Sequence, residues 1–319
     1  MFLCYNFCME FNHIPILKNE IINLLNINKA GTYVDCTVGG AGHSSAICEK
    51  LGQSGKIICF DKDIEALNVS KARLSKFDCE KIFVHNDFHN YKSVLETLNI
   101  NKVDGVLIDL GVSSYQLDNA ERGFSYRFDG KLDMRMNKDQ DFSAYDVVNS
   151  YSTQKLTEIL FDYGEEPFTK SIVRNIIKHR DKKPIETTQE LVEIISESVP
   201  TKNQIDKSSV KRVFQAIRIE VNGELVGLKE TLMDIINSLN VGARFAVLTF
   251  HSLEDRIVKD LFKRESTDCL CDKRLPVCVC KHIASIKLVN KKPIVAEKEE
   301  ILQNSRSKSA KLRVIEKVF

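Results

Sequence analysis

Short, nearly continuous apolar runs alternate with amphipathic segments in the first third of the chain. The runs lie at 33–36, 56–61, 81–85 and 103–109. Runs of this kind indicate strands that are buried on both faces, as in a parallel sheet. Helical spacing precedes the first run, over 19–25, and recurs between the runs at about 44–52, at 64–74 and near Val94. This alternation predicts a doubly wound α/β sheet.

The pattern changes beyond Gly111. Residues 111–130 are rich in Ser, Asn, Asp and Gly and have no periodicity. From about Ser143 the spacing is helical, which predicts helices over 152–163, 168–182, 188–198 and 208–221. Thr187 and Glu190 have the spacing of a capping box for the third of these helices.

The sheet pattern resumes after this helical stretch. One helix and three β-rich segments are expected, at 223–239, 244–250, 285–289 and 311–318. Residues 1–112 and 214–319 are therefore predicted to form one discontinuous sheet domain. Residues 113–213 are predicted to form a helical insertion within it.

Composition is that of an ordinary water-soluble protein. The 319 residues are 43% hydrophobic and 28% charged. No apolar run approaches the roughly 20 residues that a membrane helix needs. The first residues are apolar but lack a basic leader and a small-residue cleavage site, and Met9 competes with Met1 as the initiator. We therefore expect a cytoplasmic protein without a membrane partner.

Positive charge is concentrated in the C-terminal part. The net charge is only +2, yet residues 256–319 contain 16 Lys and Arg against 8 Asp and Glu. This asymmetry favours a polyanionic partner, although a basic C-terminus is also a common solvated tail. Within the insertion, positive residues recur every four positions on one helix face at Lys170, Arg174 and Lys178. A solvated face is the usual explanation, and contact with RNA phosphates is the alternative.

Ten cysteines are present. Six are scattered, as expected for thiols in a reducing cytoplasm, so no disulfide-linked partner is expected. The other four form a C-x-C-x6-C-x-C cluster at Cys269, Cys271, Cys278 and Cys280. Four thiolates can hold one Zn²⁺, but paired ligands are usually separated by two residues rather than one. The spacing therefore favours a loop of free thiols over a structural zinc site.

A glycine-rich turn joins the first strand to the next helix. It reads Gly39-Gly40-Ala41-Gly42, and Ser44 opens the helix. Glycines allow positive φ and let a ligand approach the main chain, while the helix start presents free N–H groups. The turn suits a ligand with a carboxylate or phosphate, although many α/β folds use such a turn only for packing.

Acidic residues follow the other strands of the predicted sheet. Asp61 ends the second strand, Asp87 and Phe88 follow the third, and Asp109 ends the fourth. Ligands of open α/β sheets bind outside these carboxyl ends. A carboxylate only accepts hydrogen bonds, so Asp61 suits a ribose diol, with a helix cap as the alternative. Phe88 is placed to cover an adenine face or only to seal the sheet edge.

Two ligands fit these features, a dinucleotide and S-adenosylmethionine. The dinucleotide fingerprint G-x-G-x-x-G is incomplete, because Ser45 occupies its last position. A carboxylate at Asp109 would repel a pyrophosphate, whereas it stabilises the sulfonium cation of S-adenosylmethionine. The residues therefore favour S-adenosylmethionine, and an NAD-dependent oxidoreductase on the same sheet is the main alternative.

The segment from Asp109 to Gln116 is a specific motif. Together with seven other motifs along the chain, it makes nearly the whole sequence resemble the bacterial MraW/RsmH family. The motifs are His13-x-Pro15, Asp35-x-Thr-x-Gly-Gly-Ala-Gly-His-Ser44, Asp109-Leu-Gly-Val-Ser-Ser-Tyr-Gln116, Glu121-Arg-Gly-Phe-Ser125, Leu132-Asp-Met-Arg-Met136, Tyr163-Gly-Glu-Glu166, Phe214-Gln-Ala-Ile-Arg-Ile-Glu-Val-Asn222 and Phe250-His-Ser-Leu-Glu-Asp-Arg-Ile-Val258. The family methylates N4 of a cytosine in the decoding region of 16S ribosomal RNA.

The resemblance implies a class I (Rossmann-like) S-adenosylmethionine-dependent methyltransferase fold: α/β, with a mostly parallel doubly wound sheet and an inserted helical domain that recognises RNA. The implied substrate is the 16S rRNA of the 30S ribosomal subunit. The implied cofactor-binding residues are Ala41, Gly42 and His43 for the methionine part, Asp61 for the ribose, Phe88 for the adenine, and Asp109 and Gln116 to complete the pocket.

The chemistry of the reaction suggests further candidates. Cytosine N4 is a poor nucleophile, so an enzyme must orient it and accept its amino protons. Asp109 is the candidate acceptor, and orienting the cofactor is its alternative role. Asp133 with Arg135 is predicted to close over the base or to form a local ion pair. His251 with Asp255 is expected to contact substrate rather than to pair at a helix N-terminus.

The target base must leave its stack to be methylated, and Tyr115 or Tyr126 is a candidate to stack on it. No catalytic metal is expected. A non-catalytic RNA-binding assembly factor that keeps the fold is the second alternative function.

Overall fold

The computed structural model describes residues 15–319 except 273, 275 and 276, so His13 of the first motif and both candidate initiators lie outside it. Its centre is a seven-stranded sheet in the order β3-β2-β1-β4-β5-β7-β6. The strands are β1 (Thr32–Asp35), β2 (Lys56–Asp61), β3 (Glu80–His85), β4 (Val103–Asp109), β5 (Leu239–Thr249), β6 (Ile286–Leu288) and β7 (Lys311–Lys317). β7 runs opposite to the other six strands, so its pairings with β5 and β6 are antiparallel and the remaining pairings are parallel. The predicted mostly parallel α/β sheet is confirmed.

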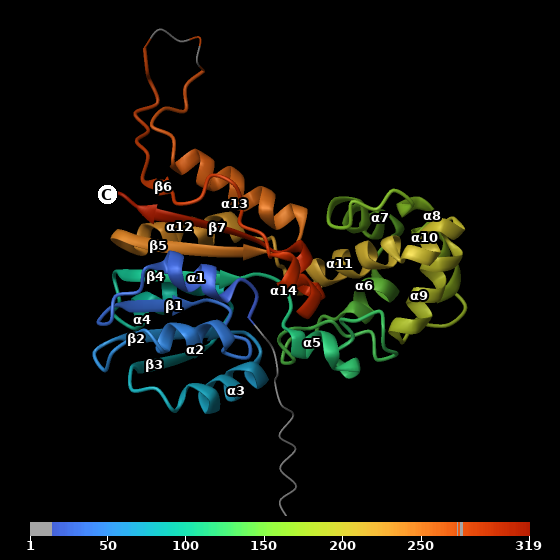
Figure 1. The fold of residues 1–319 in the computed structure, drawn as a ribbon. Coiled ribbons are helices and arrows are strands. Elements are labelled where there is room, and N and C mark those ends of the chain that lie inside the picture. Colours follow the sequence, from blue (N-terminus) through green and yellow to red (C-terminus); the bar gives the residue numbers. More distant parts are fainter. Residues whose placement is uncertain (1–14, 273, 275–276) are drawn as a thin grey trace, which may run out of the picture.

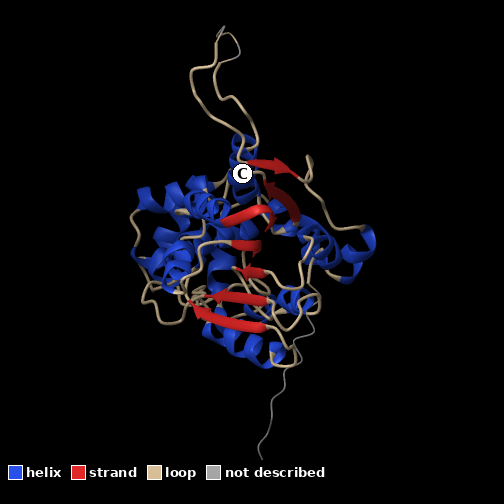
Figure 2. Cartoon of the chain, turned by 90° about the vertical axis from the view of Figure 1, so that its left-hand side faces the viewer, coloured by secondary structure: helices blue, strands red, loops and turns tan. Residues whose placement is uncertain are grey.

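Two layers of helices cover the sheet (Figure 2). One layer comprises α1 (Lys18–Leu25), α2 (Gly42–Cys48) and α3 (Ile64–Leu74), and the other α4 (Tyr91–Thr97), α12 (Leu228–Ser238) and α13 (Ser252–Glu265). In β2, Ile57 and Cys59 pack into the core of the first layer, and Ile58 and Phe60 into that of the second. Successive strand side chains point to opposite faces, so a continuous apolar run requires both layers.

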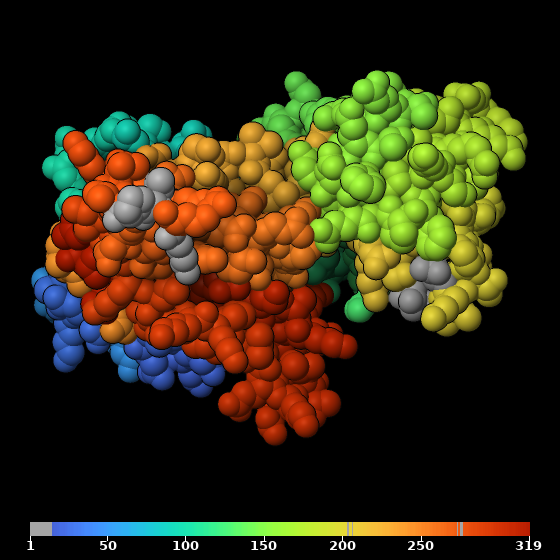
Figure 3. All heavy atoms as spheres, turned by 90° about the horizontal axis from the view of Figure 1, so that it is seen from above, coloured from blue at the N-terminus to red at the C-terminus, as the bar shows by residue number. Residues whose placement is uncertain are grey.

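A third hydrophobic core holds the helical insert, which lies beside the sheet (Figures 1 and 3). The insert contains α5 (Ser114–Asp118), α6 (Ala144–Ser150), α7 (Thr153–Asp162), α8 (Thr169–Arg180), α9 (Thr188–Glu197), α10 (Thr201–Asp206) and α11 (Ser208–Asn222). The predicted domain boundary at 213/214 falls inside α11, and both Val213 and Phe214 belong to this core. The division into two domains stays a prediction.

Every predicted strand is present, and the capping box of Thr187 and Glu190 is confirmed. β5 begins at Leu239, earlier than its apolar run indicates. Four short helices were not predicted: α5, α6, α10 and α14 (Lys298–Gln303). With five or six residues, α5, α10 and α14 are too short for a periodic pattern. Within the described residues, no helix has the length and apolar character needed to span a bilayer.

A buried ion pair joins the insert to the sheet domain. Arg122, only 2% exposed, donates to Asp63 at 2.8 Å and to Glu65 at 3.2 Å, at the start of α3. Its Nη2 donates to the backbone carbonyls of Arg135 and Met136. Arg122 thereby holds the loop around 133–136 against the carboxyl edge of the sheet.

Candidate active site

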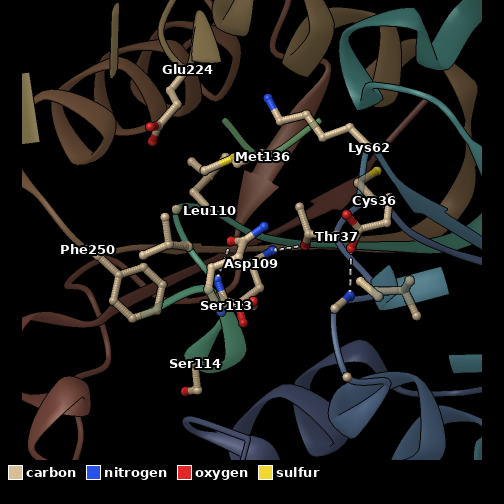
Figure 4. A pocket seen from close by; sticks show the side chains of 18 of the residues that line it. Cys36, Thr37, Lys62, Asp109, Leu110, Ser113, Ser114, Met136, Glu224 and Phe250 are labelled. Atoms are coloured by element: carbon tan, nitrogen blue, oxygen red, sulfur yellow. Dashed lines mark hydrogen bonds between the residues drawn. The ribbon is translucent and has the colours of Figure 1, made fainter. Parts of the chain in front are cut away.

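A cavity of about 370 Å³ lies at the carboxyl ends of the parallel strands. Residues of the loops after β1, β2, β3, β4 and β5 line it, together with residues of α11 and Met136. Parallel strands end at one edge of the sheet, so segments far apart in the sequence meet there. In Figure 4, Thr37 and Phe250 lie on either side of Asp109, and Met136 and Glu224 approach from the insert side.

The glycine turn and Asp61 form one wall of the cavity. Gly39 N–H donates to Asp61 Oδ2 at 2.8 Å, and Asp63 N–H donates to Asp61 Oδ1 at 2.9 Å. Burial raises the pKa of Asp61 to about 6, so the group is ionised at neutral pH. Each carboxylate oxygen can accept a further hydrogen bond, which leaves capacity for a pair of hydroxyl donors.

The first residues of α2 belong to the same wall of the cavity. Ala41 is fully buried, has a φ of 58° and caps the helix, and it does not line the cavity. Gly42 and His43 do line it. A Cβ atom on Gly42 would lie 2.6 Å from Pro15 Cγ, so the close packing of the N-terminal segment requires glycine at this position.

Asp109 projects from the end of β4 toward the centre of the cavity. Its N–H donates to Thr37 Oγ1 at 2.7 Å, and its Oδ2 lies 3.8 Å from His43 Nε2. Among the described residues, its buried Oδ1 has no hydrogen-bond partner. Burial, followed by the nearby carboxylates of Asp35 and Glu254, raises the pKa of Asp109 to about 8. A cationic ligand group beside Oδ1 would satisfy this carboxylate.

A network of ion pairs forms the opposite wall. Arg218 of α11 donates to both carboxylate oxygens of Glu224 at 2.8 Å. His251, which caps α13, lies 3.0 Å from Glu254. Burial opposes ionisation of Glu254, but the His251 hydrogen bond and the charges of His251 and Arg218 hold its pKa below the ordinary value. This wall therefore has a fixed pattern of donors and acceptors.

Comparison with known proteins identifies the family. The model of the MraW methylase family matches residues 10–318, which is nearly the whole chain. The chain belongs to the MraW methylase family. The "Ribosomal RNA small subunit methyltransferase H" of Clostridium botulinum (strain Loch Maree) is 53% identical over 310 residues, covering 97% of this chain and 100% of the relative. The protein of the same name from Clostridioides difficile is 51% identical over 311 residues with the same coverage.

A solved rRNA methylase from Streptococcus thermophilus covers 95% of the chain and is itself covered to 94%, with 12% identity and a TM-score of 0.38. A solved SAM-dependent O-methyltransferase from Thermotoga maritima covers 95% of the chain and is covered to 64%, with 10% identity and a TM-score of 0.40.

Most residues that the MraW resemblance assigns to the cofactor line the cavity: Gly42, His43, Asp61, Phe88, Asp109 and Gln116. The side chain of Gln116 is already engaged, because Nε2 donates to Asp63 and Oε1 accepts from Ser113 N–H. Gln116 therefore shapes the wall through its contacts. Phe88 stacks on His89 with ring centroids 4.4 Å apart.

Other candidates lie elsewhere. Asp133 forms the local ion pair with Arg135, at 2.8 Å, and does not line the cavity. Neither candidate stacking tyrosine lines it, and Tyr126 packs edge-on against Phe214 in the insert core. His251 lines the cavity, and its expected contact with substrate stays a prediction. Its ring lies beside Glu254 and not Asp255, because the Asp255 carboxylate binds two cations of β7, Lys311 and Arg313.

The lining residues that were assigned no role from the sequence include Lys62, Arg218, Glu224, Phe250 and Glu254. Lys62 and Phe250 each directly follow a strand end, a signal that was available. Arg218 lies on a helix of the insert, and its arrival at the cavity depends on packing between regions distant in sequence. On α8, Lys170, Arg174 and Lys178 are exposed, as their spacing predicts.

Proposed function

We propose that this chain transfers a methyl group from S-adenosylmethionine to the N4 amino group of a cytidine in the decoding region of 16S rRNA. Membership of the MraW methylase family and relatives named as small-subunit rRNA methyltransferases support the reaction class. The observation that carries the proposal is the unsatisfied carboxylate oxygen of Asp109 in a cavity whose other wall contains the glycine turn and Asp61.

The residues present fit the cofactor. S-Adenosylmethionine, when bound, supplies an electrophilic methyl group on a sulfonium cation. Asp61 has acceptor capacity for the ribose hydroxyls, and Phe88 offers an aromatic face for the adenine. Gly42 and His43 line the cavity and are the proposed contacts of the methionine part. The negative charge of Asp109 favours a bound cation over the neutral product, which promotes product release.

Asp109 also acts on the substrate amine in this proposal. A carboxylate that accepts a hydrogen bond from the N4 amino group orients the nitrogen. It also stabilises the positive charge that develops on this nitrogen as the new bond forms. The Asp109 backbone is held by its bond to Thr37, which limits movement of the carboxylate. Phe250 flanks the same point and provides an apolar surface for a displaced base.

The exposed cationic face of α8 is the proposed contact with rRNA phosphates. Lys170, Arg174 and Lys178 lie on the insert, outside the cavity. By contrast, Lys183 is paired with Glu186 and Glu190. We therefore assign the phosphate contact to α8 and not to the segment that follows it.

The experiment is methyl transfer from radiolabelled S-adenosylmethionine to 30S subunits that lack the modification, with mapping of the product nucleoside. The wild type is expected to give N4-methylcytidine, and Asp109→Ala is expected to lose at least about 100-fold in rate. Asp260→Asn, an exposed acid 63% accessible on α13, is the matched control. Tight 30S binding without transfer would favour the assembly-factor alternative, and co-purified NAD would favour the oxidoreductase.

A further inference from the structure

The four clustered cysteines lie on the segment that connects α13 to β6. This segment projects away from the body of the molecule (Figure 1). Its described apolar side chains are exposed, with Leu270 at 43% and Val277 and Val279 at 70% and 71%. These described apolar side chains form no hydrophobic core, so their burial does not define the conformation of the segment.

The four sulfur atoms converge at one point of this segment. The Sγ atom of Cys278 lies 3.4 Å from that of Cys269, 4.0 Å from that of Cys271 and 3.6 Å from that of Cys280. Cys269 and Cys280 are 3.9 Å apart, and all four sulfurs lie within 4.8 Å of one another. These cysteines are free thiols rather than disulfides.

The spacing of the sulfurs matches a tetrahedral metal site. A Zn–S bond of about 2.3 Å places the corners of a tetrahedron about 3.8 Å apart. These four sulfur–sulfur separations, 3.4–4.0 Å, bracket this value. Four uncharged thiols have no comparable reason to gather at one exposed point, since each could be solvated separately.

The backbone supports the same arrangement from both sides. Leu270 N–H, between the first two cysteines, approaches Cys280 Sγ at 3.3 Å. Val279 N–H, between the last two, approaches Cys271 Sγ at 3.3 Å. Each pair thus receives an amide donor from the other pair, and such bonds stabilise metal-bound thiolates. In each pair the single intervening residue supplies the donor.

We propose that Cys269, Cys271, Cys278 and Cys280 bind one zinc ion that holds the projecting segment in its folded form. The geometry thus reverses the preference for free thiols drawn from the spacing alone. Binding converts four thiols to thiolates and releases their protons, with no change of oxidation state. The site lies outside the catalytic cavity, so its role is structural.

The test is metal analysis of the full-length protein purified under reducing conditions, by inductively coupled plasma mass spectrometry. The wild type is expected to hold ~one equivalent of zinc per chain, and Cys278→Ser/Cys280→Ser less than about a tenth. Cys4→Ser/Cys8→Ser removes two cysteines from elsewhere in the chain and is the matched control, expected to keep the metal. If the wild type is purified without metal, it is reconstituted with Zn²⁺, dialysed against a weak chelator and analysed again.

A second measurement does not depend on how the variant folds. Alkylation of wild-type protein with iodoacetamide, read by peptide mass spectrometry, is expected to spare all four cysteines until a strong chelator is added. Rapid alkylation of the four after zinc reconstitution, or metal retention by the double variant, would overturn the proposal. An equivalent of iron in place of zinc would overturn the assignment of the metal. Neither readout uses methyl transfer, so failure of the zinc site is distinguishable from failure of the proposed function.

Discussion

Among the described residues that line the cavity, Asp109 has the one buried carboxylate oxygen without a hydrogen-bond partner. Replacing Asp109 by Asn removes this carboxylate. A sulfonium or ammonium group about 4 Å from the carboxylate gains roughly 4 kcal/mol at an effective dielectric constant of about 20. The Asp109 side chain is 26% exposed, and solvent screening reduces this to roughly 2–3 kcal/mol. At about pH 9, where Asp109 is mostly ionised, Asp109→Asn is therefore expected to weaken S-adenosylmethionine binding about 30- to 150-fold.

The same carboxylate makes binding depend on pH. Burial raises the pKa of Asp109 to about 8. Near neutral pH, the Asp109 carboxyl of the ligand-free protein is therefore mostly protonated. A cation binds the ionised form, and its affinity should rise with pH until the group is fully ionised. If only the ionised form binds, the gain from about pH 7 to pH 9 is roughly tenfold. Asp61, with a pKa of about 6, stays ionised across this window.

Isothermal titration calorimetry of the wild type, Asp109→Asn and the control Asp260→Asn measures both effects. The amino group of the cofactor also titrates near pH 8, so S-adenosylhomocysteine, which has the same amino group and an uncharged sulfur, serves as the reference ligand. The affinity ratio of the two ligands should rise with pH in the wild type and stay flat in Asp109→Asn. Binding within threefold of wild type, with an unchanged pH profile, would refute this role of Asp109.

Two further predictions concern the insert. Arg122→Met leaves Asp63 buried without its cation, and should lower the free energy of unfolding by about 3–5 kcal/mol in urea denaturation; a loss below about 1 kcal/mol would contradict the proposed anchoring. Reversing the three charges of α8 to Glu should weaken binding to rRNA and lower the slope of log affinity against log salt by about 2, as measured by filter binding, while S-adenosylmethionine affinity stays unchanged. An unaltered salt slope would return Lys170, Arg174 and Lys178 to the role of a solvated face.

The mostly parallel character of the sheet and the position of the site follow from local pattern. Apolar runs of four to seven residues, separated by helical spacing, determine a parallel sheet because only burial on both faces accommodates them. Once the sheet is parallel, Asp61 and Asp109 must lie at one edge together with the glycine turn. This is why the gathering of Gly42, Asp61 and Asp109 at one cavity could be predicted before any tertiary contact was known.

Partners distant in sequence could not be predicted in this way. Three examples join residues more than 30 positions apart. Gln116 donates to Asp63, Arg218 reaches the cavity, and Arg313 of β7 binds Asp255. Each depends on how helices pack on the sheet, which local propensity does not specify.

The cysteine cluster illustrates the same limit. Its spacing alone argued for free thiols, whereas the folded segment brings four sulfurs to tetrahedral separations. The sequence by itself determined the sheet, its carboxyl edge and the acids along that edge, because strand periodicity and strand direction are local properties. Tertiary structure alone decided which polar groups are satisfied and which remain available to a ligand, because that depends on contacts between distant parts of the chain.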